Sequence, residues 1–229
     1  MIETKKMIAL LPIKEHSERI PNKSFKTIDH KPLFSFVIDT LLSSNFISKV
    51  AINTDSQKII NEVKKLYSSN SIEFINRPKE LIGDFVPMND IIKYDISQFE
   101  NNSFIQTHIT NPLLKTKTID KAILFYKNNT YDSIVSVNEH KSRFYDSKHN
   151  PINHDGSSNI LRTQDLKPLY EENSCFYIFT KDSFIKNGNN RIGNKPFYFT
   201  INKLESIDID YYEDLQLARA LYKGDELKK

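Results

Sequence analysis

Short apolar runs and amphipathic stretches alternate along the chain. Met7–Leu11 is a continuous apolar run, which is typical of a strand buried on both faces. Similar patterns predict strands at 50–52, 72–75, 104–107, 133–137, 175–180, 197–200 and 207–209. Apolar residues at helical spacing predict helices at 33–41, 56–66, 88–99, 116–125 and 211–222. Strands that alternate with helices in this way indicate an α/β fold, with a mostly parallel Rossmann-like sheet and helices on both faces.

The range 139–170 interrupts this alternation. It is polar and carries turn signals at Asn150-Pro151 and Asp155-Gly156, so it predicts a hairpin that protrudes from the sheet. Structureless loops beyond ~15 residues are uncommon in compact domains. We therefore expect this segment to dock on a second copy of the chain, with Phe144 and Tyr145 as anchors. The alternative is a disordered surface loop.

Composition narrows the class of protein. Within 229 residues, 32 Lys+Arg oppose 29 Asp+Glu, and both signs are mixed, which argues against a nucleic-acid binder. The length suits a single domain spanning 1–229. The one cysteine, Cys175, excludes an intramolecular disulfide and a cysteine-based metal cluster, and it fits a reducing cytoplasm. No apolar run approaches the ~20 residues of a membrane span.

Three cations follow the first strand. Lys14, Arg19 and Lys23 lie close to a strand end, where open parallel sheets bind their ligands. Flexible cations and backbone N–H groups suit a polyphosphate. The segment has no glycine, so it is neither a Walker A loop nor a dinucleotide fingerprint. The alternative is a solvated basic loop.

Two carboxylates stand near the end of the chain. Asp208 and Asp210 are two residues apart, so an extended backbone places them on the same face. Adjacent carboxylates repel unless a cation lies between them, and hard oxygen ligands suit Mg²⁺ shared with substrate phosphates. The alternative is an aspartate at a strand end, followed by Asp210 as the N-cap of the last helix.

Two further polar segments follow strands. Asn53–Ser56 is explained by helix capping. Thr107–Leu114 carries His108 and Asn111, which could hydrogen-bond a base or a sugar; the alternative is a plain strand-to-helix turn that Pro112 ends.

Motifs run in a constant order over nearly the whole chain. They are LPIKEHSERIPNK at 11–23, NTDS at 53–56, RPKELIGD at 77–84, TNPL at 110–113, RTQDL at 162–166, YEEN at 170–173 and SIDIDYYEDL at 206–215. Together they resemble the acylneuraminate cytidylyltransferase family, the CMP-sialic acid synthetases and their relatives. Four positions depart from the family pattern: Lys14 replaces an arginine, Glu15 and His16 replace two glycines, and His108 replaces a glutamine.

The resemblance implies a fold, an activity and a set of roles. The fold would be of the nucleotide-diphospho-sugar transferase type, and CTP and an acidic 2-keto-3-deoxy sugar would give the CMP-sugar and pyrophosphate. The chain would form a homodimer, in which 139–170 caps the neighbour's sugar site. The implied nucleotide-binding residues are Lys14, Ser17, Arg19, Asn22, Lys23, Arg77, His108 and Asn111. The implied sugar-binding residues are Arg162, Gln164 and Asn173. Asp208 and Asp210 would hold Mg²⁺. Lys14 and Lys23 would act in catalysis together with these two aspartates.

Other activities remain open at this point. The acid sugar could be the eight-carbon Kdo, although the Q-G-D segment usual in Kdo enzymes is absent, or the nucleotide could be UTP or another one. A degenerate paralogue that only binds nucleotide is a third possibility. The Asp208 and Asp210 pair argues against it, because a protein that only binds nucleotide has no need of a metal-holding pair.

Overall fold

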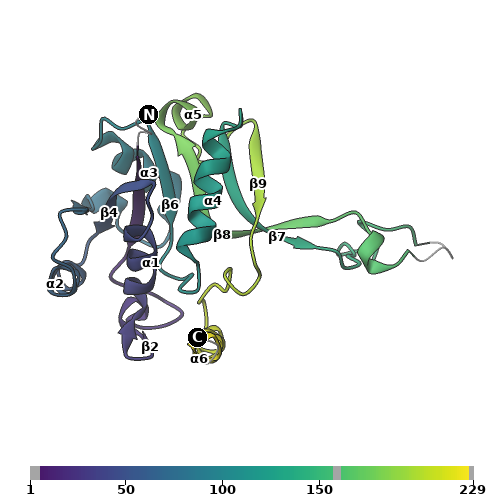
Figure 1. The fold of residues 1–229 in the computed structure, drawn as a ribbon, viewed down its shortest axis with the longest axis horizontal. Helices are drawn as coiled ribbons and strands as arrows, with labels where there is room; N and C mark the ends of the chain where they lie inside the picture. The colour runs from purple at the N-terminus through teal and green to yellow at the C-terminus, as the bar shows by residue number, and fades with distance from the viewer. Residues whose placement is uncertain (1–5, 157–160, 227–229) are drawn as a thin grey trace.

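One seven-stranded sheet forms the centre of the molecule (Figure 1). The computed structural model describes residues 6–156 and 161–226. The strand order is β5-β4-β1-β6-β8-β7-β9. The strands are β1 Met7–Ile13, β4 Ile47–Thr54, β5 Ile72–Asn76, β6 Ser103–Thr107, β7 Ser133–His140, β8 Leu169–Thr180 and β9 Pro196–Thr200.

Six of these strands run in one direction, and β8 alone runs against them. The pairs β1–β4, β1–β6, β4–β5 and β7–β9 are parallel, whereas β8 is antiparallel to both β6 and β7. The prediction of a mostly parallel sheet is confirmed. Because β1, β4 and β6 are neighbours, the loops that follow them meet at one edge of the sheet.

Helices cover both faces of the sheet. The helices are α1 Leu33–Leu42, α2 Gln57–Leu66, α3 Met88–Ser97, α4 Thr116–Lys127, α5 Lys181–Lys186 and α6 Tyr212–Glu226. Alternate residues of β1 point to opposite faces, since a strand has a side-chain period of two. Ala9 and Leu11 pack with α1, α2 and α4, whereas Ile8 and Leu10 pack with α3 and α5. Burial of β1 on both faces explains its continuous apolar run.

A third apolar cluster attaches α6 to the loop after β1. Ile20, Ile28 and Leu33 pack against Leu215 and Ala218 of α6. Ile28 belongs to a small hairpin of β2 Thr27–Ile28 and β3 Lys31–Pro32, and β2 and α6 lie at the same end of the molecule in Figure 1. This contact places the segment before α6 beside the loop after β1, although the two are far apart in sequence.

A hairpin arm projects from the sheet, as Figure 1 shows. β7 and β8 remain paired beyond the sheet, through Val137↔Glu172 and His140↔Leu169. A bulge interrupts their pairing, and within it Ser174 has a left-handed φ of 55°. Bulges bend strands, so this irregularity explains how the arm turns away from the sheet. The protruding hairpin is confirmed, whereas its role in dimerisation stays a prediction.

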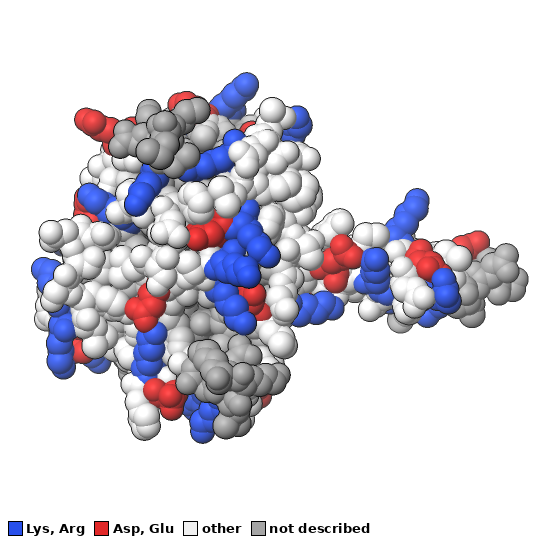
Figure 2. All heavy atoms as spheres, in the orientation of Figure 1, with Lys and Arg blue, Asp and Glu red and all other residues white. Residues whose placement is uncertain are grey.

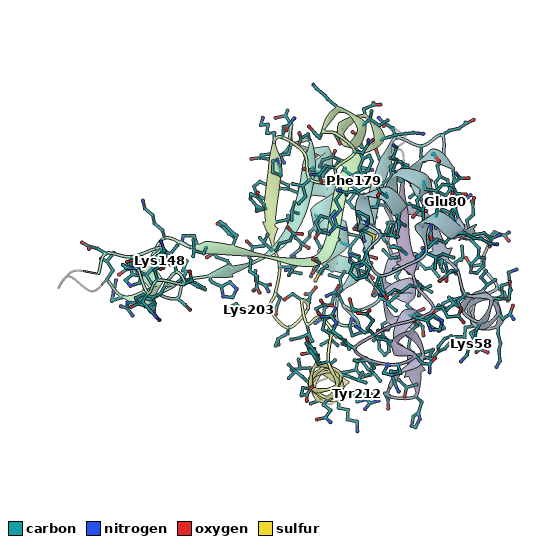
Figure 3. All side chains as sticks on the ribbon, turned by 180° about the vertical axis from the view of Figure 1, so that it is seen from behind. Lys58, Glu80, Lys148, Phe179, Lys203 and Tyr212 are labelled. Atoms are coloured by element: carbon teal, nitrogen blue, oxygen red, sulfur yellow. The ribbon has the colours of Figure 1, made fainter. Side chains whose placement is uncertain are left out.

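Side chains tie the arm together internally. Asn153 donates to the Ser142 and Lys167 carbonyls, and Asp146 accepts the backbone N–H groups of Lys148 and Asn150. Figure 3 shows Lys148 well out on the arm, far from Phe179 in the sheet. Hydrogen bonds within the arm therefore connect its described residues on both sides of the hairpin.

One local prediction is wrong, and one short helix was missed. The range 207–209 forms no strand: its backbone is extended, but Ile209 N–H donates to the Thr110 carbonyl, at 2.9 Å, outside the sheet. The six-residue helix α5 was not predicted, because so short a helix shows little periodicity; a capping box of Thr180 and Ser183 begins it.

The charged side chains on the surface and the hydropathy of the helices were compared with what the composition predicts. Cationic and anionic side chains are interspersed over the face drawn in Figure 2, the arm included. Among the residues that the structure describes, no helix is both long and apolar enough to cross a membrane.

Candidate active site

A pocket of about 230 Å³ opens at the carboxyl ends of β1 and β6. Five of the residues assigned to nucleotide binding line it: Lys14, Ser17, Lys23, Arg77 and His108. Residues from β1, from the loop 83–86 and from the start of α3 complete the wall. The structure therefore brings together segments that lie almost a hundred residues apart in sequence.

The loop after β1 turns so that Lys23 points inward. Asn22 adopts a left-handed φ of 54°, a conformation that asparagine tolerates better than most residues, and it begins a short 3₁₀-helix, Lys23–Phe25. Lys23 is only 8% exposed, and its Nζ donates to the Ile209 carbonyl at 2.6 Å. Asn22 itself is exposed and does not line the pocket, so its visible contribution is to the turn.

Two cations meet one carboxylate beside the pocket. Arg19 Nη1 lies 2.6 Å from Asp210 Oδ2, and Lys23 Nζ lies 3.4 Å from Asp210 Oδ1. Burial lowers the pKa of Lys23, while the charges of Asp210 and Asp208 oppose that shift. This end of the pocket is an ionic cluster whose cations could turn toward phosphate oxygens.

Asp208 lies close enough to Asp210 for the two charges to interact. Desolvation of its carboxyl raises the pKa of Asp208, a hydrogen bond from Thr110 opposes this shift, and the charge of Asp210 raises the pKa further. The mutual repulsion expected for a shared cation site is therefore present.

The donor set of this pair fits a hard cation that also binds phosphate. No group of three or more acidic, histidine or cysteine side chains gathers within residues 6–156 and 161–226. Two carboxylates alone leave coordination positions for substrate phosphates and water, which is the usual way in which proteins bind Mg²⁺.

Lys14 also lines the pocket and is half-exposed. Its Nζ pairs with Asp84 Oδ1 at 2.5 Å, and this hydrogen bond lowers the pKa of the Asp84 carboxyl. Asp55 accepts the Glu15 N–H at 3.0 Å and fixes the loop at its base. Asp55 therefore anchors the loop after β1. The side chain that caps α2 is Ser56, which accepts the Ile59 N–H.

Arg77 is held by a buried relay that sequence analysis missed. Its Nε donates to Asn53 Oδ1 at 2.6 Å and its Nη2 to the Asn53 carbonyl at 3.1 Å. Asn53 Nδ2 in turn donates to Asp95 Oδ1 at 2.5 Å. Asp95 is fully buried on α3, among the apolar positions Ile91, Ile92 and Ile96, and an acid within such a stripe was the available signal.

Asp95 should make stability depend on pH. Its pKa is raised to about 7, mainly by burial, against 3.8 in an unfolded chain. Between about pH 4 and pH 7 the folded state keeps a proton that the unfolded state loses, so stability falls as the pH rises. Asp95→Asn keeps the acceptor for Asn53 and removes the charge. We expect this variant to match wild type near pH 4 and to be more stable than wild type above pH 7, by roughly 2–4 kcal/mol.

Urea unfolding at pH 4.5 and pH 8 measures this difference. Asp90→Asn is the matched control, because Asp90 is an exposed acid on the same helix. Equal pH dependence of wild type and Asp95→Asn would contradict the prediction.

His108 reaches the pocket in a defined tautomer. Arg191 Nη1, which can only donate, lies 2.6 Å from Gln106 Oε1, so Gln106 Nε2 faces His108 Nε2, at 3.0 Å. His108 Nε2 therefore accepts, and its proton is on Nδ1. Burial lowers the pKa of His108 to about 3, with a further contribution from the charge of Arg191. The ring is neutral at physiological pH and can donate one hydrogen bond.

Other predicted site residues lie outside the pocket lining. Asn111 is buried and its Nδ2 donates to the Ile207 carbonyl at 3.4 Å, so it joins the turn after β6 to the segment that carries Asp208. Asn173 donates to Asn138 Oδ1 at 3.1 Å, and Ser206 donates to the same oxygen.

Arg162 and Gln164 lie on the arm. Both are exposed, and Arg162 forms a two-point ion pair with Asp165, at 2.7 and 3.3 Å. The residues that line the pocket all fall between 12 and 110, so none belongs to the arm of the same chain.

Sequence comparisons identify the family of the chain. A family model described as "Cytidylyltransferase" matches residues 8–228. An N-acylneuraminate cytidylyltransferase of Streptococcus agalactiae is 26% identical over 91% of this chain, and the chain spans about half of that relative's length. A pseudaminic acid cytidylyltransferase of Campylobacter jejuni is 26% identical over 95% of this chain and 97% of its own length.

Structural comparisons support the same fold. A CMP:2-keto-3-deoxy-manno-octonic acid synthetase complexed with CTP superposes with a TM-score of 0.68 at 13% identity, over 96% of this chain and 99% of the other. At that identity the likeness shows the fold alone. The family match covers almost all of the described structure, including the pocket and the Asp208 and Asp210 segment, and on that match the chain belongs to the cytidylyltransferase family.

Proposed function

We propose that this chain transfers a cytidylyl group from CTP to an acidic 2-keto-3-deoxy sugar of the sialic-acid type. The anomeric hydroxyl would attack the α-phosphorus and release its proton to water. A new P–O bond would form, the bond between the α-phosphorus and the oxygen that bridges it to the β-phosphate would break, and pyrophosphate would leave with that oxygen. No enzyme nucleophile is needed, since positioning and charge stabilisation dominate such transfers. The observation that carries the proposal is the buried Lys23, which joins the pocket to the carboxylate pair through Asp210.

The triphosphate would replace Asp210 as the partner of Arg19 and Lys23. Arg19 and Lys23 contact Asp210, and a phosphate oxygen is an equivalent acceptor for both cations. Their transfer to the triphosphate would release the Asp210 oxygens, so that Asp208 and Asp210 could hold Mg²⁺ together. Bound Mg²⁺ lowers the negative charge that the incoming hydroxyl meets. Lys14 would also contact the triphosphate, and Ser17, Arg77 and His108 would complete the nucleotide site.

The sugar site would be completed by a second copy of the chain. Arg162 and Gln164 lie on the arm, outside the pocket of their own chain. Exposed apolar side chains on the arm, among them Tyr145, Ile152 and Leu161, are suited to contact with another chain. We therefore propose a homodimer whose arms reach across. Its location in the cytoplasm stays a prediction that rests on the single cysteine.

A screen of pyrophosphate release tests the proposed function. Each of CTP, UTP, ATP and GTP is combined with N-acetylneuraminate, pseudaminate, diacetyllegionaminate and Kdo. We expect release with CTP and at least one nine-carbon acid sugar. Binding of CTP without release from any pair would favour the non-catalytic paralogue.

Lys14 should contribute directly to CTP affinity. Lys14→Ala removes a charge-assisted contact, and we expect CTP binding to weaken roughly tenfold by calorimetry. Lys14→Arg keeps the charge and should be tolerated far better. Asp84→Asn is the control: it removes the negative charge that pairs with Lys14 in the free protein, so CTP affinity should not fall. Equal losses in Lys14→Ala and Asp84→Asn would mean that the ion pair, and not a phosphate contact, matters.

A further inference from the structure

Arg191 is a half-buried cation to which the nucleotide chemistry gives no role. It lies between α5 and β9, and its guanidinium carbon stands 3.7 Å from the centre of the Tyr177 ring. Its Nη1 donates to Gln106 Oε1 at 2.6 Å. Gln106 and Tyr177 are both fully buried and lie on the adjacent strands β6 and β8. The guanidinium therefore contacts two side chains that the sheet holds in place.

The charge of Arg191 has no ion-pair partner in the described parts of the chain. Glu172 is near enough to raise the pKa of Arg191, against the lowering that burial causes, but the Glu172 carboxylate accepts the Tyr177 hydroxyl. A desolvated guanidinium without a paired carboxylate is costly, and arginine cannot relieve the cost by losing its proton. Such a group, partly exposed and without an ion pair, is a candidate for binding an anionic ligand.

The network of Arg191 leads to the pocket. Gln106, which accepts from Arg191, also contacts His108, and His108 lines the pocket. The backbone N–H of Arg191 donates to Asn89 Oδ1, and Asn89 follows Met88, which lines the pocket at the start of α3. Arg191 therefore lies beside the wall of the pocket that His108 and α3 form, on the same chain.

The chemistry of the substrate explains why an anion site is needed there. In a 2-keto-3-deoxy acid sugar the carboxylate is bonded to the anomeric carbon, whose hydroxyl attacks the phosphorus. The carboxylate must therefore enter the reaction pocket with that hydroxyl. Lys14, Arg19 and Lys23 are engaged by the triphosphate in the proposed reaction, which leaves the sugar carboxylate to another cation.

We propose that Arg191, beside the pocket of its own chain, binds the carboxylate of the acid sugar and selects acidic sugars over neutral ones. This inference rests on the proposed function. Arg191 suits the role better than Arg162, because Arg162 already has a two-point ion pair with Asp165 and is largely exposed. A planar guanidinium can bind a carboxylate through two parallel hydrogen bonds.

Kinetics of Arg191→Gln with paired substrates test the proposal. The substrates are the best acid sugar of the screen, for example N-acetylneuraminate, and its C1 methyl ester, which lacks the charge. We expect KM for the acid to rise about thirtyfold, and the preference for acid over ester to collapse, whereas the calorimetric Kd for CTP should change far less, because glutamine at 191 can still donate to Gln106. Arg162→Gln is the matched control and should keep the preference for the acid.

A second variant guards against loss of the fold. Arg191→Lys keeps the charge over Tyr177 and loses the two-point geometry, so it should give an intermediate KM with an unaltered melting temperature. An acid-to-ester preference that stays within twofold of wild type in both variants overturns the proposal. Absence of pyrophosphate release by the wild-type protein with every acid sugar would instead overturn the proposed function, and the inference with it.

Discussion

Turnover of the Asp210→Asn variant should fall at least about a hundredfold in the presence of Mg²⁺. Asp210 is one of two proposed metal ligands, and a bound metal supplies several kcal/mol of charge stabilisation, where each 1.4 kcal/mol is a tenfold change in rate. The amide keeps an oxygen that can accept from Arg19 or Lys23, and the side chain is partly exposed, so we expect little change in melting temperature.

CTP binding distinguishes this explanation from a loss of phosphate contacts. In EDTA, Asp210→Asn should bind CTP at least as tightly as wild type, because Arg19 and Lys23 no longer share a carboxylate with the triphosphate. Asp214→Asn is the matched control: Asp214 accepts the backbone N–H groups of Asp210 and Tyr211 and is assigned no metal. Near-wild-type turnover of Asp210→Asn would contradict the hypothesis that Asp208 and Asp210 hold Mg²⁺.

Deleting residues 146–158 from the arm should abolish sugar turnover and dimer formation. The range ends outside the described residues, and it removes the tip that includes Ile152, which is 54% exposed. Loss of the tip would take away the proposed contact with the partner and displace Arg162 and Gln164 from the partner's pocket. Light scattering at micromolar concentration reports the mass, and pyrophosphate release reports turnover.

The body of the protein should survive this deletion. The arm leaves the sheet at the bulge before Tyr177, and its hydrogen bonds are mostly internal, so CTP binding should persist. A wild-type mass of one chain would exclude the dimer. A shortened protein that remains dimeric and fully active would leave the arm without the proposed role.

The sequence predicts the strands of the sheet and the charged residues of the site because each of these signals is local. The apolar residues of Met7–Leu11 are contiguous, the three cations fall within positions 14–23, and Asp208 and Asp210 are two residues apart. The error at 207–209 has the same origin. Alternation predicts an extended backbone correctly, but it cannot tell whether the N–H of Ile209 meets a strand or the turn at Thr110.

The missed residues depend on contacts between distant segments. Asp95 meets Asn53 from 42 positions away, and Arg191 meets Gln106 from 85 positions away. The sequence around Asp95 or around Arg191 does not by itself show whether the polar side chain is buried against a partner or faces solvent. Their roles follow only once the topology places β4 beside α3, and β6 beside the loop before β9.

The bulge at the base of the arm makes the molecule modular. On one side of it lie the strands that carry the nucleotide residues and Arg191; on the other lies a hairpin with its own internal hydrogen bonds. The carboxylate and the anomeric carbon are common to all acid sugars of this class, whereas their side chains differ. Selection could therefore change the arm, and with it the sugar that is accepted, while the chemistry in the body stays constant. Grafting the corresponding hairpin of a relative onto residues 139–170 would be a direct route to altered specificity.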